Sequence, residues 1–145
     1  MSLFSTLSVS ASGMAAQRTR AELLVENLAN AETTRTADGG PYRRKDVVFE
    51  TQAASSPFAS MLDSALNGAP AGVHVSEVTV DESDPEQRYM PGHPDANANG
   101  YVAFPHINPA EEMVNLMDAS RSYQANVASM SAVKDMILKS IDLLR

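Results

Sequence analysis

The sequence predicts an α+β protein with a long helix at each end of the chain and a small β-rich domain between them. Apolar and small residues recur at alternating spacings of three and four near both termini. All eight prolines and six of the seven glycines fall between residues 38 and 109. Because helix interiors avoid both residue types, we expect helices over residues 1–33 and 108–145 and a β-rich domain with extended loops over 34–107. The two helices are expected to form an antiparallel coiled-coil pair.

The N-terminal helix is predicted from a stripe of mostly apolar and small residues. Its members are Leu3, Leu7, Ser10, Met14, Gln17, Ala21, Leu24, Leu28 and Ala31. At 1.5 Å per residue the helix would be roughly 42 Å long. Gly13 is its weak point and costs about 1 kcal/mol relative to alanine. The small residues of the stripe should allow a partner helix to approach closely.

The middle of the chain contains three short runs that favour strands, at residues 46–51, 73–80 and 101–104. Turn-forming clusters of glycine, proline and aspartate separate these runs. Residues 52–70 have little pattern, and we expect a loop there with a short helix at 58–66. The role of residues 50–75 does not follow from the sequence.

The C-terminal helix carries a second stripe with the same spacing over more than four heptads. Its members are Met113, Leu116, Ser120, Tyr123, Val127, Met130, Lys134, Ile137, Ile141 and Leu144. Asn108 and Pro109, followed by Glu111 and Glu112, predict the helix start. An antiparallel pair would bury one stripe of each helix, so the remaining apolar surface is expected to contact other copies or other subunits.

Composition and charge exclude several classes of protein. The 145 residues include no cysteine, so disulfides and thiolate metal sites are excluded. The net charge is −7, and residues 51–112 carry nine acidic residues and one basic residue, which argues against nucleic-acid binding. No run approaches the roughly 20 apolar residues of a membrane-spanning helix. The N-terminus lacks the basic and apolar regions of a cleaved secretory signal.

Histidine and carboxylate patterns give little support for a metal site or a catalytic site. His74, His93 and His106 have no helical partner at the spacing that zinc sites use. The segment from Asp95 to Gly100 resembles the opening of a calcium loop, but position twelve is histidine instead of glutamate, and a turn built from asparagine side chains explains the same residues. A soluble metal-binding module using His93, Asp95 and His106 remains a distant alternative.

Other charged clusters also favour a structural interpretation. The acidic run at residues 81–86 has no apolar surroundings that would raise a carboxyl pKa, so we expect a solvated loop. No serine elbow or phosphate-binding loop is present, and we expect no catalytic residues, no cofactor and no small-molecule substrate. The basic triplet at residues 43–45 is expected to be an exposed patch, or to contact an acidic neighbouring subunit.

Polar residues within the helical stripes form a separate group. Asn27 and Asn30 lie near the end of the first helix, and Gln124 and Asn126 lie within the last. Polar groups near a coiled-coil seam often fix the register between helices. Asn30 is also suited to ending a helix.

Several segments resemble the flagellar axial proteins, the family of rod, hook and hook-associated proteins. The N-terminal segments are SGMAAQ at residues 12–17, with Gln17, and ENLANAETT at 26–34, with Asn27 and Asn30. The C-terminal segment is EMVNLMDASRSYQAN at 112–126, with Gln124 and Asn126. The short middle, with HPDANANGYV at 93–102 and PHINP at 105–109, is similar to the proximal rod members. His106 departs from the asparagine expected in that last segment.

The resemblance implies a structural subunit of the bacterial flagellar basal-body rod. The rod crosses the periplasm and transmits torque. Its partners would be other rod subunits and further copies of this chain in a helical array. Export would use the flagellar type III export apparatus without a cleaved signal. The alternative within the family is another rod or hook-type protein.

Overall fold

A computed structural model describes residues 3–37, 39–51 and 72–143. The predicted short helix at 58–66 and the stripe residue Leu144 lie outside these residues. The elements in order are α1 (Leu3–Ala29), β1 (Lys45–Thr51), β2 (Val73–Val80), β3 (Glu86–Tyr89), β4 (Tyr101–Phe104) and α3 (Pro109–Asp142). This arrangement confirms the α+β class.

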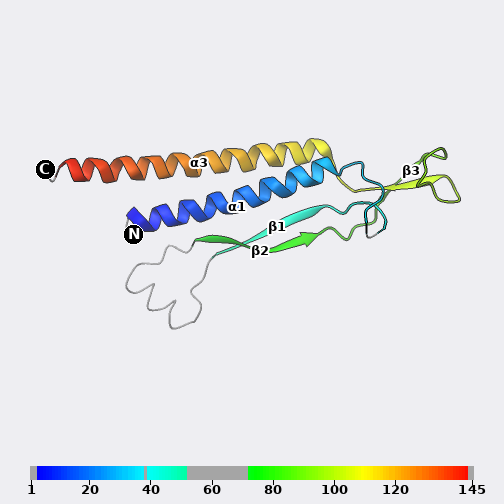
Figure 1. Cartoon of the computed structure of the whole chain (residues 1–145), viewed down its shortest axis with the longest axis horizontal. Helices are drawn as coiled ribbons and strands as arrows, with labels where there is room; N and C mark the ends of the chain where they lie inside the picture. Colours follow the sequence, from blue (N-terminus) through cyan, green and yellow to red (C-terminus); the bar gives the residue numbers. More distant parts are fainter. Residues whose placement is uncertain (1–2, 38, 52–71, 144–145) are drawn as a thin grey trace, which may run out of the picture.

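The two terminal helices lie side by side and run in opposite directions (Figure 1). They have 27 and 34 residues, and no described helix is long and apolar enough to cross a membrane. On its other side α1 packs against β1 and β2, so α1 forms a middle layer between α3 and a strand pair. Among the described elements, α3 packs only against α1.

Local side-chain bonds set the inner ends of both helices. α1 ends at Ala29, four residues before the predicted boundary at residue 33, because the Asn30 amide turns back and donates to the Glu26 carbonyl at 2.9 Å. The interpretation of Asn30 as a helix-ending residue is confirmed. α3 begins as predicted: Asn108 is its N-cap and accepts a hydrogen bond from the Ala110 amide at 3.1 Å.

The strands form two separate antiparallel pairs. β1 pairs with β2, with an irregularity between Val48 and Phe49, and this pair lies along α1. β3 pairs with β4, and this second pair lies beyond the end of the two helices (Figure 1). The three predicted strands are confirmed, but β3 was missed because its sequence, EQRY, shows no alternation of apolar residues. Its strand conformation depends on pairing with β4.

The helices meet through small residues. The buried apolar residues of α1 and α3 are Ala16, Leu24, Ala119 and Val133. At Gly13 an added Cβ would lie 3.1 Å from the Asn126 side-chain nitrogen, so the helices approach closely there. This close approach explains why alanine and glycine positions, rather than the largest side chains, form much of the contact.

Candidate assembly site at the junction of the helices and strands

Asn27 lies in the last turn of α1 and is fully buried, with 0% of its surface exposed. Its amide nitrogen donates to the Lys45 carbonyl at 2.8 Å and to the Glu112 carboxylate at 3.1 Å. Its amide oxygen accepts from the Tyr42 hydroxyl at 3.0 Å and from the Lys45 backbone nitrogen at 2.9 Å. Two donors and two lone pairs are the full capacity of an asparagine side chain. One side chain thus connects α1 with β1 and with α3.

Glu112 supplies the α3 side of this junction. It lies in the first turn of α3 and is only 3% exposed. Arg44 donates to its Oε1 at 2.7 Å, while Asn27 donates to its Oε2. A buried carboxylate is tolerated only when it is paired in this way, and removing one partner of such a pair costs about 3–5 kcal/mol. We call Asn27, Tyr42, Arg44, Lys45 and Glu112 the joint.

Tyr42 lies in the segment before β1 and donates a hydrogen bond to Asn27. Burial, reinforced by the negative charge of Glu26, raises the pKa of Tyr42 to about 12. The hydroxyl therefore stays protonated near neutral pH and remains a hydrogen-bond donor to Asn27.

The basic triplet at residues 43–45 pairs largely within its own chain. Arg44 bonds Asp46 as well as Glu112. The Lys45 ammonium pairs with Glu26 at 2.5 Å and lies 5.6 Å from the centre of the Tyr42 ring. The expectation of an exposed patch is therefore wrong for Arg44 and Lys45, which are half-buried, and holds for the exposed Arg43.

A second contact between the terminal segments lies about halfway along the helix pair. Gly13 of α1 faces Asn126 of α3, whose amide also donates to the Ser122 carbonyl at 3.1 Å. The two segments that resemble the axial family, one at each end of the chain, thus meet in space. Gln17 lies one turn away on α1, and its buried side-chain oxygen has no hydrogen-bond partner in the part of the chain that the structure describes. Gln124 is exposed.

The structure divides the predicted stripe residues into two groups. Those that are buried or half-buried are Leu7, Met14, Leu24, Leu28, Leu116, Met130 and Ile137. Those that are exposed are Leu3, Met113, Tyr123, Val127 and Ile141. The face of α3 that packs on α1 instead includes Glu112, Ala119, Asn126 and Val133. Each of these residues directly precedes a member of the predicted stripe.

Four exposed apolar residues, separated by polar residues, line the uncovered side of α3. Met113, Met117, Val127 and Leu138 are each about half exposed. At 100° per residue they fall within a sector of roughly 80°, about a third of a turn from the face that packs on α1. We call these four residues the outer stripe.

The segment that resembles a calcium loop is a turn. The Asn97 side-chain oxygen accepts from the backbone nitrogens of Asn99 and Tyr101, both at 2.9 Å. The Asp95 carboxylate accepts from the Thr34 hydroxyl at 2.8 Å and lies 3.7 Å from Arg35. The interpretation as an asparagine-built turn is confirmed. In the ranges that the structure covers, no three histidine or acidic residues are grouped so as to hold a metal ion.

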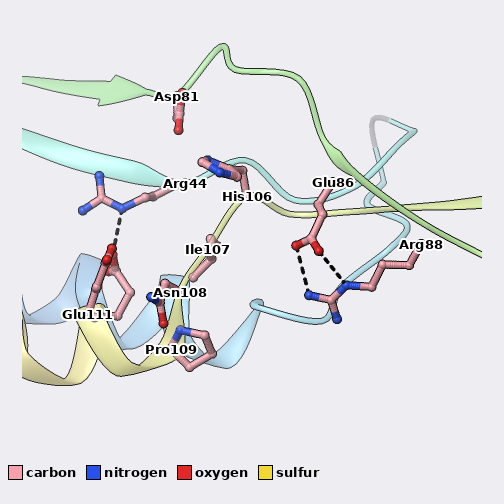
Figure 2. A pocket seen from close by; sticks show the side chains of 10 residues that line it. Arg44, Asp81, Glu86, Arg88, His106, Ile107, Asn108, Pro109 and Glu111 are labelled. Carbon is pink, nitrogen blue, oxygen red and sulfur yellow. Dashed lines mark hydrogen bonds and ion pairs between the residues drawn. The ribbon is translucent and has the colours of Figure 1, made fainter.

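An open hollow of about 600 Å³ lies beside the joint, at the start of α3. Figure 2 shows Arg44, Asp81 and His106 on one side of it and the Glu86–Arg88 ion pair on the other. Its charged groups largely pair with one another: Arg44 bonds Glu112, and Arg88 bonds Glu86 at 3.0 Å. This arrangement suits a solvated surface between two elements better than a substrate site.

Comparisons with known proteins match this chain from end to end. It is 44% identical to the flagellar basal-body rod protein FlgC of Bacillus subtilis over 150 residues, covering 99% of both chains. The identity to the FlgC of Salmonella typhimurium is 41% over 143 residues, covering 99% of this chain and 98% of the relative. For the FlgC of Borreliella burgdorferi it is 37% over 153 residues, covering 100% and 99%. The chain belongs to the FlgC family.

A family model described as the C-terminal part of the flagellar basal body rod FlgEFG proteins also matches residues 98–143. That range contains β4 and α3. Membership of the FlgC family confirms the resemblance carried by the terminal segments and by the short middle. In this FlgC-family chain, both terminal segments contribute to the contact between α1 and α3.

The sequence indicated a role for Asn27 but not its connection to the other members of the joint. Arg44 was expected in an exposed patch, Glu112 was interpreted as an acidic residue of a first helical turn, and no role was predicted for Tyr42. A signal was present, because Glu112 lies only one residue from the predicted stripe and so carries a charge close to the helix contact. A buried carboxylate needs a cationic partner. The basic triplet at residues 43–45, next to a predicted strand, was a candidate for that partner.

Proposed function

We propose that this chain is a structural, non-enzymatic subunit of the proximal rod of the bacterial flagellar basal body. It polymerises helically with other rod subunits and with copies of itself to form the torque-transmitting drive shaft. The observation that carries this proposal is the near full-length similarity to flagellar basal-body rod proteins named FlgC.

The outer stripe supports the proposal physically. A single chain leaves Met113, Met117, Val127 and Leu138 about half exposed along one side of α3. Extended exposed apolar surfaces mark protein contacts in soluble proteins. In the proposed rod, neighbouring subunits cover this surface and gain the burial that one chain lacks.

The terminal helices act in this proposal as an antiparallel coiled-coil pair, over residues 1–33 and 108–145, that lines the inner tube of the rod. The β-rich residues 34–107 face outward. The joint fixes the register of the pair at one end, because Asn27 and Glu112 are bonded directly. The predicted stripe residues make the contacts within the pair and between subunits. The flagellar type III export apparatus delivers the chain.

Leu138→Asp tests this role, with Ala132→Asp as the matched control. Both residues are exposed on α3 and lie roughly 120° apart around the helix. Each variant is introduced into a strain from which the native gene has been deleted. We expect the deletion strain to lack flagella, Ala132→Asp to restore swimming, and Leu138→Asp to accumulate without supporting rod assembly.

Two results would count against the proposal. If the deletion strain still formed flagella, the proposed rod function would be wrong. Full swimming with Leu138→Asp would show that the outer stripe is not an assembly surface. Circular dichroism of both purified variants separates these outcomes from misfolding.

A further inference from the structure

The strand pair β3–β4 and the loop between its strands form an arm, residues 85–104, that lies beyond the end of the helix pair (Figure 1). Its exposed tip carries Tyr89, Met90 and Tyr101, which are 65%, 43% and 43% exposed. The two tyrosine rings meet edge-on with their centres 5.3 Å apart. Tyrosine and methionine are enriched where proteins contact one another. We call these three residues the tyrosine tip.

Hydrogen bonds within the chain order the tyrosine tip without a partner. The Met90 amide donates to the Gly100 carbonyl at 2.8 Å, and Asn97 fastens the turn between the strands by two further bonds. The arm is tied to the segment after α1 by the bond from Thr34 to Asp95. A surface that is already ordered loses little conformational entropy on binding.

The charges of the two ends of the molecule are opposite. Residues 81–104, from the end of β2 to the end of the arm, contain five acidic residues and one basic residue. The described helical segments farthest from the arm, residues 3–20 and 119–142, contain five basic and two acidic residues. Within the described ranges Glu82 and Asp84 have no ion-pair partner, and neither have Lys134 and Lys139. Unpaired charges of opposite sign at the two ends favour contact between different copies.

One chain cannot bring these two surfaces together. α3 has 34 residues and is therefore about 50 Å long, and the arm lies at its N-terminal end. Leu138 and the lysines around it lie near the opposite end. A contact between the two surfaces therefore joins two copies, and since the surfaces differ, it leaves each pair open to further addition.

We propose that the tyrosine tip of one copy docks on the outer stripe of a second copy, over the part of α3 that follows Arg121. Val127 and Leu138 provide the apolar surface, and Lys134 and Lys139 face Glu82 and Asp84 at the base of the arm. This contact rests on the proposed rod function and specifies which surfaces of two copies meet. It gives the subunit a directional, head-to-tail contact.

The absence of cysteine from the sequence allows a direct test. Full-length Met90→Cys and Leu138→Cys proteins are mixed at concentrations where sedimentation shows self-association of the unmodified chain, and are then oxidised. We expect the mixture to form disulfide-linked dimers several-fold faster than either variant alone. Ser76→Cys, an exposed position on β2 that lies six residues before Glu82, replaces Met90→Cys in the matched control and should not react faster with Leu138→Cys than with itself.

Charge reversal provides the second measurement. Reversing Glu82 and Asp84 to lysine should slow cross-linking of Met90→Cys to Leu138→Cys, and reversing Lys134 and Lys139 to glutamate on the other partner should restore it. The rate should also fall at about 0.5 M salt, where the Debye length is below ~5 Å.

The outcomes distinguish this contact from the broader function. Association of the unmodified chain without preferential cross-linking in the mixture overturns the head-to-tail contact and leaves the rod function intact. An absence of self-association at any concentration overturns both the contact between copies and the proposed polymerisation. Random collisions between cysteines would not restore the cross-linking rate when the charges on both partners are reversed.

Discussion

Replacing Asn27 with alanine removes the central side chain of the joint while leaving the helix propensity of α1 at least as high. The change breaks four hydrogen bonds, three to neutral groups and one to the Glu112 carboxylate. Neutral bonds contribute about 0.5–1.5 kcal/mol each and a bond to a charged group about 1.5–3 kcal/mol. Because neighbouring groups relax in part, we expect a loss of roughly 3–5 kcal/mol in the free energy of unfolding.

The assay is urea unfolding of the purified full-length chain followed by circular dichroism. With a slope of about 1–3 kcal/mol per molar urea, the expected loss lowers the midpoint by at least about 1 M. Asn99→Ala is the matched control, because Asn99 is exposed in the arm loop and its side chain makes no hydrogen bond within the described ranges. We expect that change to cost less than about 0.5 kcal/mol.

The reasoning about the joint is refuted if Asn27→Ala costs less than about 1 kcal/mol with an unchanged slope, since a buried carboxylate and hydroxyl would then have lost their partner at no expense. A double-mutant cycle with Glu112→Gln gives an independent measure. Two residues bonded at 3.1 Å should show a clear coupling energy. Strictly additive effects would mean that the bond does not stabilise the folded chain.

Three further predictions follow from single positions. Gly13→Leu should destabilise the helix pair by roughly 1–3 kcal/mol, because a Cβ there would already lie 3.1 Å from Asn126, and thermal unfolding beside the milder Gly13→Ala measures this. Gly100→Ala should speed amide exchange in the arm but not in α3, because Gly100 has φ +82° and an added Cβ would lie 2.9 Å from the Tyr89 ring. The same exchange rate in the arm as in the unmodified chain would contradict this. Between pH 10 and pH 12 the folded state binds the Tyr42 proton more tightly than the unfolded state, so stability should fall by up to about 2–3 kcal/mol as the pH rises. Tyr42→Phe should lack that part of the decline, which urea midpoints at each pH will show.

The helices were predictable because their signals are local. Asn108 and Pro109 mark the start of α3, because asparagine caps a helix and proline is favoured at its first position. No proline or glycine interrupts the helix over the next 34 residues. The face that α3 turns toward α1 was not predictable from the same pattern. It depends on tertiary contacts, such as the close approach of Asn126 to Gly13 and the burial of Ala119.

The joint was only partly predictable for a related reason. Asn27 could be identified from its position near a helical stripe, but its partners come from segments 15 and 85 residues away along the chain. Whether a tyrosine, an arginine and a glutamate meet at such separations depends on tertiary packing. β3 was missed on the same grounds, because its exposed residues become a strand only through pairing with β4.

The middle position of α1 separates two kinds of genetic defect. The buried positions of α1, such as Ala16 and Leu24, are covered by its own chain, so damaging substitutions at them should lower the amount of protein and behave as recessive losses. α3 leaves one side uncovered, so substitutions there should spare the individual molecule. Such a subunit still joins a growing shaft through its intact surfaces and then blocks the next addition. Expressed beside the normal gene, changes on that side of α3 should therefore inhibit motility dominantly, and changes at the buried positions of α1 should not.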